Sequence, residues 1–573
     1  MSTLTNLLVQ AATDHPDAVA AADEQQCLTY AQLWAAVGHT AHALRDAQLG
    51  GRAVLLALPP GTGWITALLA AWRAGAVAVP LDTAHPPARL AQIATACRAS
   101  GVVTVNGRPP VWAGHLTALA PAQASIFPPP LVPVGDDAVA CIWHTSGSTG
   151  SPKPVQITHG AVAARATALP PLYGLTHTDR IAQLTSPAFD AVLWEVLVAL
   201  TTGARLQIAG PADRLPGPML TRFLKEHRIT AFTCTPTHLA ATPFADLPCL
   251  QCIVLGGEAP RVEPLAAWIR RYNVANAYGP TEACVEAIVA ERVSAEELSV
   301  PIGRPLPGVT AWILDEHQQP VLQGDAGELY LGGDGLAAGY LALPDETNRA
   351  FPHLELRFPD GLLSRVRVYR TGDRVRQQQD GQYVFLGRMD DQLNLGGVRL
   401  EPGEVEAAAT RMPGVRAAVL HAEQPDSGGR RRLVLHVEAD DLGLPPRLRQ
   451  HLASVLPPSG VPALIFVRPS LPRITSGKID RLALARANAP ATALTTTSSA
   501  PVPEDVAGWW QEYTGTPADG SADYFACGGD SLSALLLVQQ INEAYGTAIT
   551  VGDFVADPTI TFLSAALFSG SSS

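Results

Sequence analysis

The sequence predicts a chain of four parts: a large α/β region, a small α+β region, a linker and an all-α tail. From residue 1 to about 390, stretches typical of helices alternate with short apolar runs typical of buried strands. This alternation predicts parallel strands joined by crossover helices, with ligands bound at the carboxyl ends of the strands. At 573 residues, the chain is also too long for a single core.

Six apolar runs are the clearest strand candidates of the first region. They are RAVLLAL at 52, AVAVPL at 76, VACIW at 139, RLQIAG at 205, ITAFTCTP at 229 and CIVLGG at 252. Between about 391 and 485, EVEAAATRM favours a helix, and AAVLHAE and RLVLHVEA favour strands. These three segments predict a small α+β unit.

The C-terminal part follows a stretch typical of a linker. Residues 487–503 are mainly Ala, Pro, Ser and Thr without charge, and beyond them Leu532, Leu535, Leu536 and Ile541 recur at helical spacing before a likely stop at Gly546. The predicted boundaries are therefore 1–389, 390–486, 487–503 and 504–573.

The composition excludes several classes of protein. The formal charge is 40 − 52 = −12, which argues against a general nucleic-acid binder. No apolar stretch reaches about 18 residues, and the N-terminus lacks the basic residues of a secretory signal, so we expect a cytoplasmic protein without a membrane span. The eight cysteines do not resemble a disulfide framework, and the single CLQC at Cys249 and Cys252 favours buried thiols over a metal or redox site.

Lysine is rare in this chain. Of 40 basic residues only Lys153, Lys225 and Lys478 are lysines, and two of the three lie in the Gly/Ser-rich loops GSPKP and TSGKID. Lysine carries a compact ammonium group on a flexible side chain, whereas arginine carries a planar guanidinium group. Lys153 and Lys478 are therefore candidates for chemistry, with solvated loop lysines as the alternative.

Several polar loops fit a nucleotide site when taken in order. HTSGSTGSPKP at 144 offers backbone donors, hydroxyls and a lysine to a polyphosphate, although it is not a Walker A loop. NAYGPTEACV at 276 combines an aromatic ring, a hydroxyl and a carboxylate, and YRTGDRVR at 369 offers Asp373 to ribose hydroxyls. GRMDDQLNLGGVRLEPGEVE at 387 joins the first region to the second. Each loop alone could be a polar turn, but their combination indicates a nucleotide site.

The tail carries a separate motif, DYFACGGDSLSALLL at 523. It places Ser531 after two glycines at the start of an apolar helix, where a phosphodiester is favoured by the helix dipole. Taken alone, GGDSL could be a helix cap.

Together with LTYAQL at 28, AWRAGAVAVPLD at 71, FDAVLWE at 189, GELYLGGDGLAAGY at 327 and SGKIDR at 476, these motifs carry a family resemblance. From about 25 to 481 the chain resembles the ANL adenylating enzymes, and within them the adenylation domains of nonribosomal peptide synthetases. The tail resembles a peptidyl carrier domain. The resemblance implies an α/β adenylation core, a small mobile α+β subdomain and an all-α carrier bundle.

The resemblance implies a two-step reaction with ATP, Mg²⁺ and 4′-phosphopantetheine as cofactors. An amino acid and ATP would give an aminoacyl-AMP and pyrophosphate, and the thiol of a phosphopantetheine on Ser531 would then take the acyl group. Lys478 would bridge the carboxylate and the α-phosphate, Glu282 would bind Mg²⁺, and Asp390 would be the hinge of the small subdomain. The implied ATP-binding residues are Thr145, Ser146, Gly147, Ser148, Thr149, Lys153, Gly257, Glu258, Asn276, Tyr278, Thr281, Asp373 and Arg388.

Two departures from the family pattern concern the loops. Asn394, Leu395, Gly396 and Gly397 stand where the family typically has Lys-Ile-Arg-Gly, which affects the expected phosphopantetheine contacts rather than adenylation. Pro154 stands where the family usually has Gly, and is expected to stiffen the end of the phosphate loop.

An α-amino acid is the expected substrate. Asp190 lies in the otherwise apolar SPAFDAVLWEVLVAL, where an unpaired carboxylate is costly, so we expect a cationic partner. The resemblance supplies the α-ammonium group of an amino acid. The implied pocket is Asp190, Ala191, Trp194, Thr233, Val254, Gly256, Ala277, Val285 and Glu286.

The side chains of this set favour a large hydrophobic substrate, preferably aromatic, with a branched aliphatic amino acid as the alternative. Glu286 could accept a hydrogen bond from an indole N–H or a hydroxyl, or it could face solvent.

The expected partners are a phosphopantetheinyl transferase, a downstream synthetase module or tailoring enzyme that takes the thioester in trans, and an MbtH-like helper protein as a further candidate. Two other functions remain open. One is an acyl-CoA ligase, which shares the first half-reaction. The other is a carrier or interaction protein whose adenylating site has decayed.

Overall fold

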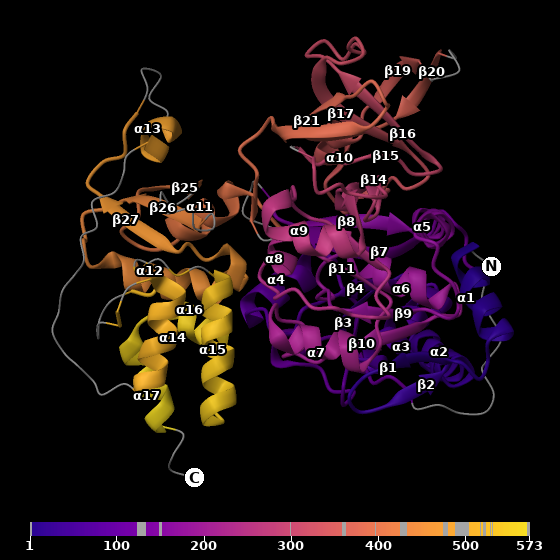
Figure 1. The fold of residues 1–573 in the computed structure, drawn as a ribbon, viewed down its shortest axis with the longest axis horizontal. Helices are drawn as coiled ribbons and strands as arrows, with labels where there is room; N and C mark the ends of the chain where they lie inside the picture. Colours follow the sequence, from indigo (N-terminus) through magenta and orange to yellow (C-terminus); the bar gives the residue numbers. More distant parts are fainter. Residues whose placement is uncertain are drawn as a thin grey trace. The chain divides into compact units, whose positions relative to one another are not determined.

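The computed structural model places the chain in two compact units (Figure 1). The first comprises residues 1–83, 91–145 and 152–397, and the second comprises 84–90, 146–151 and 398–573. The described residues are 3–122, 133–147, 152–297, 299–357, 363–395, 397–423, 432–473, 479–486, 503–515, 517–518, 523–525, 527, 529 and 531–569. The predicted linker at 487–503 lies outside them except for Pro503. The division at 397/398 falls close to the predicted boundary at Asp390, which stays a prediction.

The largest sheet of the first unit is mostly parallel. Its order is β15-β14-β13-β12-β11-β9-β10-β1-β2, with antiparallel pairs only at the two edges. Because β11, β12 and β13 are parallel neighbours, their carboxyl ends meet at one edge. The strands are β1 (Val19–Ala22), β2 (Cys27–Thr29), β9 (Arg180–Gln183), β10 (Arg205–Ile208), β11 (Ala231–Cys234), β12 (Cys252–Leu255), β13 (Asn273–Tyr278), β14 (Ile288–Ala290) and β15 (Arg304–Pro305).

The second sheet is mixed, with the order β18-β8-β7-β4-β3-β5-β6. Its strands are β3 (Ala53–Ala57), β4 (Val77–Pro80), β5 (Gly101–Thr104), β6 (Thr117–Leu119), β7 (Val139–Thr145), β8 (Lys153–Thr158) and β18 (Gly339–Tyr340). All six predicted strand segments are confirmed in these two sheets. Strand β7 pairs in parallel with β4, as predicted, and antiparallel with β8, a strand outside the six predicted runs, because the short loop between β7 and β8 returns the chain as a hairpin.

Helices surround these sheets, and four tryptophans mark the largest core: Trp64, Trp72, Trp143 and Trp194 are fully buried. Almost every residue of α3 and all of α6 are buried, which their apolar sequences explain. The helices of this part are α1 (Thr3–Asp14), α2 (Tyr30–Asp46), α3 (Thr62–Ala74), α4 (Pro87–Ala96), α5 (His159–Leu172), α6 (Val192–Leu200), α7 (Pro218–Glu226), α8 (Pro236–Ala240), α9 (Val262–Arg271) and α10 (Pro344–Ala350), with 3-10 turns η1 (Val111–Ala113) and η2 (Thr281–Ala283).

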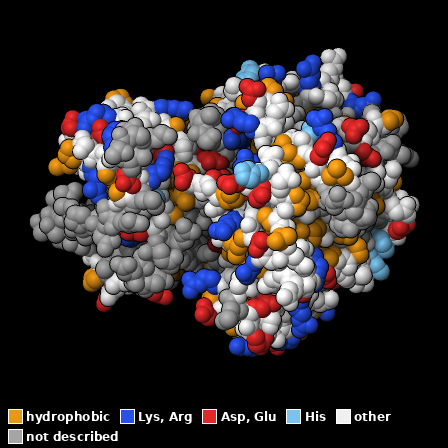
Figure 2. All heavy atoms as spheres, turned by 90° about the horizontal axis from the view of Figure 1, so that it is seen from above, with side chains coloured by type: hydrophobic (Ala, Val, Ile, Leu, Met, Phe, Trp, Pro, Cys, Tyr) orange, Lys and Arg blue, Asp and Glu red, His pale blue; other side chains and the backbone are white. Residues whose placement is uncertain are grey.

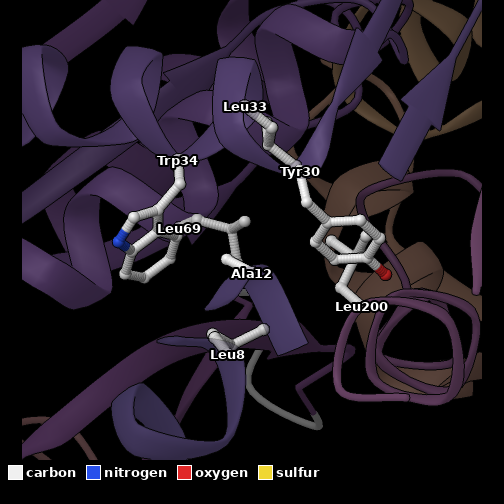
Figure 3. Close-up of a pocket in the computed structure, with 7 residues that line it drawn as sticks. All are labelled: Leu8, Ala12, Tyr30, Leu33, Trp34, Leu69 and Leu200. Carbon is white, nitrogen blue, oxygen red and sulfur yellow. The ribbon is translucent and has the colours of Figure 1, made fainter. Parts of the chain in front are cut away.

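A small apolar pocket lies among α1, α2, α3 and the end of α6 (Figure 3). Leu8, Leu69 and Leu200 line it, and the hydroxyl of Tyr30 donates to the Ala204 carbonyl at 2.7 Å. The lining offers no charged group, so this pocket does not fit the polar substrates that the sequence predicts.

A third, antiparallel sheet completes the first unit in the order β16-β17-β21-β22. Register between β21 and β22 places Asp373 opposite Arg388. The remaining strands are β16 (Val309–Leu314), β17 (Ala326–Gly333), β19 (His353–Arg357), β20 (Leu363–Arg367), β21 (Tyr369–Gln377), β22 (Tyr383–Arg388) and β23 (Leu393–Leu395).

The second unit contains the predicted small α+β region. Strands β25 and β26 pair antiparallel and β27 joins β26 in parallel, confirming the predicted strands and the helix that precedes them. Its elements are β24 (Val398–Leu400), α11 (Pro402–Thr410), β25 (Ala417–Glu423), β26 (Arg432–Glu438), α12 (Leu444–Val455), η3 (Pro458–Gly460), β27 (Leu464–Arg468) and α13 (Arg481–Arg486).

The tail forms the predicted helical bundle from α14 (Glu504–Thr514), α15 (Ser531–Tyr545), α16 (Val551–Ala556) and α17 (Ile560–Ser569). Helix α15 ends at Gly546, whose φ is 65°, as predicted. Its buried face carries Ala534, Leu537, Val538 and Ile541, whereas the predicted core positions Leu535 and Leu536 are half-buried.

The bundle also contacts the small α+β region of the same unit. Helix α12 packs against α16, and Arg449 of α12 is almost completely buried. Its Nη2 lies 2.7 Å from Asp523 Oδ2, and its guanidinium lies over the ring of Phe525 at 5.5 Å. The turn that precedes Ser531 is thereby tied to α12.

The surface agrees with the acidic composition. On the face drawn in Figure 2, acidic and basic side chains are interspersed rather than gathered into one basic patch. Within the described part of the chain, no helix is long and apolar enough to cross a membrane.

Candidate active site

The predicted pocket residues of the main sheet lie together at its carboxyl edge. Thr233 on β11 is paired in register with Val254 on β12, and its hydroxyl donates to the Val254 carbonyl at 3.0 Å. A Cβ added to Gly256 would contact the carbonyl oxygen of Ala277 on the next strand. Trp194, Val254, Ala277 and Val285 belong to one buried apolar cluster, against which Ala191 packs.

Three predicted residues of the nucleotide site and the predicted hinge residue Asp390 form a hydrogen-bonded group. The hydroxyl of Tyr278 donates to Asp373 Oδ2 at 2.5 Å, and Arg388 Nη1 donates to Asp373 Oδ1 at 2.9 Å. Arg388 also binds both carboxylate oxygens of Asp390, at 2.8 and 2.5 Å. Burial and the neighbouring Asp373 raise the pKa of Tyr278 well above its usual range.

The predicted magnesium ligand Glu282 is completely buried in the 3-10 turn η2. Tyr340 of β18 donates its hydroxyl to Glu282 Oε1 at 2.7 Å. Carboxylate and hydroxyl oxygens are the ligands that Mg²⁺ prefers, and it usually takes only one or two of them from the protein and the rest from water and phosphates. Glu282 would supply one carboxylate to a magnesium ion bound in that way.

The phosphate loop lies in the hairpin between β7 and β8. Of its predicted ligands, Ser148 and Thr149 lie outside the described residues. The Ser146 hydroxyl donates to the Arg399 carbonyl at 3.1 Å and accepts from the Glu401 N–H at 3.0 Å. Gly147 follows directly, and Thr145 is paired with Lys153 across the hairpin.

Lys153 makes contacts that the sequence does not predict. Its Nζ lies 3.2 Å from Glu346 Oε2 of α10 and 5.8 Å from the centre of the Tyr340 ring. Both side chains of this ion pair are about one-fifth exposed, so water screens the pair only partly. Lys153 is therefore held by an acidic residue at the place where a polyphosphate is predicted.

Three further predicted ATP ligands lie near the ends of β12 and β13. Glu258 Oε1 accepts from the Thr237 N–H at 3.0 Å, and Gly257 has a φ of 83° that favours glycine. Asn276 is buried and donates to the Pro301 carbonyl at 2.8 Å. Asn276 thus has a structural contact that its predicted role does not require.

Asp190 has the properties expected of a cation anchor. Its Oδ2 is shut off from solvent and has no hydrogen-bond partner within the described ranges. Burial raises the pKa of Asp190 to about 6, although hydrogen bonds from the Thr281 hydroxyl and the Val285 N–H lower it. A buried carboxylate with an unsatisfied oxygen favours a cationic ligand.

A strained turn connects Thr281 to Glu286. Cys284 and Val285 have φ values of 59° and 63°, a left-handed conformation that is uncommon for residues other than glycine. Arg165 of α5 is 1% exposed and donates from Nε to the Cys284 carbonyl at 3.0 Å and from Nη2 to the Ala283 carbonyl at 2.8 Å. Gly279 is required here, because a Cβ would overlap the Val285 carbonyl.

Glu286 is 4% exposed, which excludes the alternative that it faces solvent. The hydroxyl of Tyr173 donates to its Oε2 at 2.8 Å, and burial raises the pKa of Glu286 to about 7. The ring of Tyr173 in turn packs edge-to-face on Trp194, with centroids 5.6 Å apart.

Five residues of the site were not predicted: Arg165, Tyr173, Tyr340, Glu346 and Cys284. A signal exists for two of them, since Arg165 is the only arginine of the largely apolar stretch HGAVAARATALPPL and Tyr340 ends the motif GELYLGGDGLAAGY. Tyr173 and Glu346 carry no local pattern that distinguishes them from surface residues.

Lys478 and Ser531 belong to the C-terminal part of the second unit, which also includes residues 146–151 of the phosphate loop. Lys478 lies outside the described residues. Ser531 is the first residue of α15, which agrees with the predicted helix N-terminus, and its side chain is outside the described set. The roles of both stay predictions.

Comparison with known proteins supports a two-part chain. Residues 8–341 match the family model of AMP-binding enzymes, and residues 504–567 match the phosphopantetheine attachment site. The chain is 36% identical to the phosphinothricin tripeptide synthetase PhsC of Streptomyces viridochromogenes, over 98% of this chain and 52% of that protein. It is 33% identical to the novobiocin biosynthesis protein H of Streptomyces niveus, over 98% and 96%. The chain spans about half the length of PhsC and about a tenth of a linear gramicidin synthase of Brevibacillus parabrevis.

Solved structures show the same architecture. The chain aligns with holo-PA1221, an NRPS protein containing adenylation and PCP domains bound to a vinylsulfonamide inhibitor, with a TM-score of 0.80, 26% identity and coverage of 99% and 97%. It aligns with NpsA-ThdA, an artificially fused adenylation-PCP di-domain from Klebsiella oxytoca, with a TM-score of 0.71, 25% identity and coverage of 81% and 93%. The predicted fold class is thus confirmed.

Replacing Glu346 with Gln should strengthen polyphosphate binding. The change removes the acidic partner of Lys153, so its full charge becomes available to an anion, and affinity for ATP and inorganic pyrophosphate should rise roughly two- to tenfold. Isothermal titration calorimetry would measure both. The matched control is Asp345→Asn, which removes the same charge from an exposed neighbour on α10. An equal gain in both variants would show that only overall charge matters.

Proposed function

The chain belongs to the AMP-binding enzymes and carries a phosphopantetheine attachment site, and from this premise we propose that it activates a free α-amino acid and loads it onto Ser531. ATP and 4′-phosphopantetheine are the cofactors of these two families. The observation that carries the proposal is Asp190, whose buried Oδ2 is unsatisfied and is suited to an α-ammonium group.

The first step forms an aminoacyl-AMP with release of pyrophosphate. Lys153 and the phosphate loop hold the β- and γ-phosphates, Tyr278 packs on adenine, and Asp373 and Arg388 hold the ribose. Bound magnesium would supply positive charge next to the phosphates at Glu282. Lys478 stabilises the negative charge that develops as the amino-acid carboxylate attacks the α-phosphate.

The second step transfers the aminoacyl group from the adenylate to the thiol of a phosphopantetheine attached to Ser531, with release of AMP and loss of the thiol proton. The start of α15 supports this assignment, because a helix N-terminus stabilises a phosphodiester. The small subdomain turns about Asp390 between the two steps. A phosphopantetheinyl transferase attaches the arm, and the thioester passes in trans to a synthetase module or tailoring enzyme. An MbtH-like helper is a further candidate partner.

The substrate is a large hydrophobic amino acid, preferably aromatic. Trp194, Val254 and Val285 are buried and form apolar walls, whereas Gly256 and Ala277 leave room beside them. The match of residues 504–567 to an attachment site disfavours an acyl-CoA ligase, because such a ligase releases its product as a free thioester. The match of residues 8–341 to an enzyme family disfavours a decayed site.

Asp190→Asn should abolish amino-acid-dependent pyrophosphate exchange. Removing the charge leaves the ammonium group without its partner, and kcat/KM for the preferred amino acid should fall at least about a hundredfold. A panel of the standard amino acids would identify that substrate first. If no amino acid supports exchange in the wild-type protein, the proposed function is wrong.

The same anchor predicts a pH dependence. Because the pKa of Asp190 is raised to about 6, the carboxyl is protonated and neutral below that pH, and it binds ammonium only above it. In the wild-type protein, kcat/KM should therefore fall about tenfold per unit below pH 6, whereas the residual activity of Asp190→Asn should not show this fall.

Lys478→Ala should separate the two steps. Adenylate formation, measured by pyrophosphate exchange, should fall roughly 100- to 1000-fold because the developing charge loses its counter-ion. Transfer to Ser531 from a supplied aminoacyl-AMP should remain largely intact. An equal loss in both assays would contradict the role given to Lys478.

Ser531→Ala should have the opposite effect. Pyrophosphate exchange should continue at a rate close to wild type, because the attachment serine takes no part in adenylation, whereas intact-mass spectrometry should detect neither the phosphopantetheine arm nor the amino acid. Covalent loading of the variant would show that the arm is attached elsewhere.

A further inference from the structure

Glu286 is held in one orientation by residues outside the predicted pocket. Its only hydrogen bond among the described residues comes from the Tyr173 hydroxyl and uses Oε2, at 2.8 Å. Oε1 is thus left to another donor. A carboxylate that is held through one oxygen, and whose other oxygen makes no hydrogen bond among the described residues, favours a ligand that donates a hydrogen bond.

The backbone that carries Glu286 is fixed as well. Arg165 binds the carbonyls of Ala283 and Cys284 and places a positive charge near Glu286, which favours the ionised carboxylate. Arg165 Nη1 has no hydrogen-bond partner within the part of the chain that the structure describes, so no carboxylate is hydrogen-bonded to this nitrogen there. The backbone of Glu286 therefore belongs to a turn held by Arg165, and the positive charge of Arg165 lies near its carboxylate.

Glu286 and the predicted ammonium anchor belong to one site. The Val285 N–H binds Asp190, and Glu286 is the next residue on the turn. Tyr173, which holds Glu286, contacts Trp194 one helical turn from Asp190. An amino acid bound through its ammonium group at Asp190 would direct its side chain towards Trp194, Tyr173 and Glu286.

The rings around Glu286 favour an aromatic side chain. Tyr173 and Trp194 meet edge-to-face at an interplanar angle of 75°, a geometry that a third ring can extend. Burial and the neighbouring Glu286 raise the pKa of Tyr173 well above its usual range, so its hydroxyl keeps its proton and stays the donor to the carboxylate. The site thus offers the apolar rings of Tyr173 and Trp194 to an aromatic substrate, and the Glu286 carboxylate as a fixed hydrogen-bond acceptor.

We propose that Glu286, positioned by Tyr173, accepts a hydrogen bond from the substrate side chain, and that the substrate class is an aromatic α-amino acid with an N–H or O–H donor on its ring. This inference rests on the proposed function and narrows its substrate. Tyr173 is a positioning residue, because it acts through Glu286. A ring without a donor leaves Glu286 Oε1 without a hydrogen bond from the substrate, and a site built to bond a donor rejects such analogues more strongly than a hydrophobic pocket rejects a change in size.

The test compares phenylalanine with tyrosine, tryptophan and 4-aminophenylalanine in the pyrophosphate exchange assay. The wild-type full-length protein should prefer at least one donor-bearing substrate over phenylalanine by roughly tenfold or more in kcat/KM. Glu286→Leu should reverse that preference, and Tyr173→Phe should reduce it several-fold through KM while kcat changes little. Glu291→Leu, at an exposed acidic residue nearby, is the matched control and should leave the ratio unchanged.

The outcomes separate the two levels of the proposal. Exchange that favours phenylalanine or an aliphatic amino acid in the wild-type protein, or a ratio that Glu286→Leu leaves unaltered, would overturn the inference while the proposed function stands. If Glu286→Leu does not fold, Glu286→Gln preserves the shape and should still lower the ratio, because an amide accepts a weaker hydrogen bond than a carboxylate. No exchange with any amino acid would overturn both.

Discussion

A buried guanidinium holds the turn on which the rest of the site depends. Arg165 donates to two successive carbonyls of residues 283 and 284 and so compensates a backbone that twice adopts a left-handed conformation without glycine. Strain of this kind costs on the order of 1–3 kcal/mol per residue and persists only where surrounding contacts enforce it. The turn carries Thr281 and Glu282 on one side and Val285 and Glu286 on the other. One arginine thereby fixes the residues predicted to face the phosphates and those predicted to face the amino acid relative to each other.

The sheets supply the frame for this turn. Because β11, β12 and β13 are parallel neighbours, the small residues that follow them reach the same edge as the turn. The hairpin of β7 and β8 brings Lys153 to Glu346 and the ring of Tyr340, and Tyr340 also binds Glu282. The groups predicted for phosphate and for magnesium are thus linked through one tyrosine before any ligand binds.

Much of this arrangement could be predicted from the sequence, because it depends on local pattern. Short apolar runs predicted the strands, a lone carboxylate in an apolar stretch predicted Asp190, and the polar loops with their family resemblance predicted Glu282, Asp373 and Arg388. The antiparallel hairpin at β7 and β8 was not predicted, since strand direction depends on the partner strand rather than on the run itself. Arg165, Tyr173 and Glu346 escaped for a related reason. Their partners lie more than 100 residues away in the sequence. The apolar stretch around Arg165 was a usable signal, but nothing near Tyr173 or Glu346 distinguishes a buried pair from a solvated surface residue.

The contact between Arg449 and Asp523 bears on the mechanics of loading. It ties the turn before Ser531 to helix α12 of the same compact unit, so the carrier bundle and the small α+β region are joined by a packed contact as well as by the chain. Two domains that are joined only by the chain reorient independently, whereas two domains that are also in contact move together. The attached thiol would then arrive with the rotation of the subdomain at a high effective concentration, and the entropy of its search would be reduced before the second step begins. The ion pair between Arg449 and Asp523 can in this way speed a transfer step in which neither residue takes part.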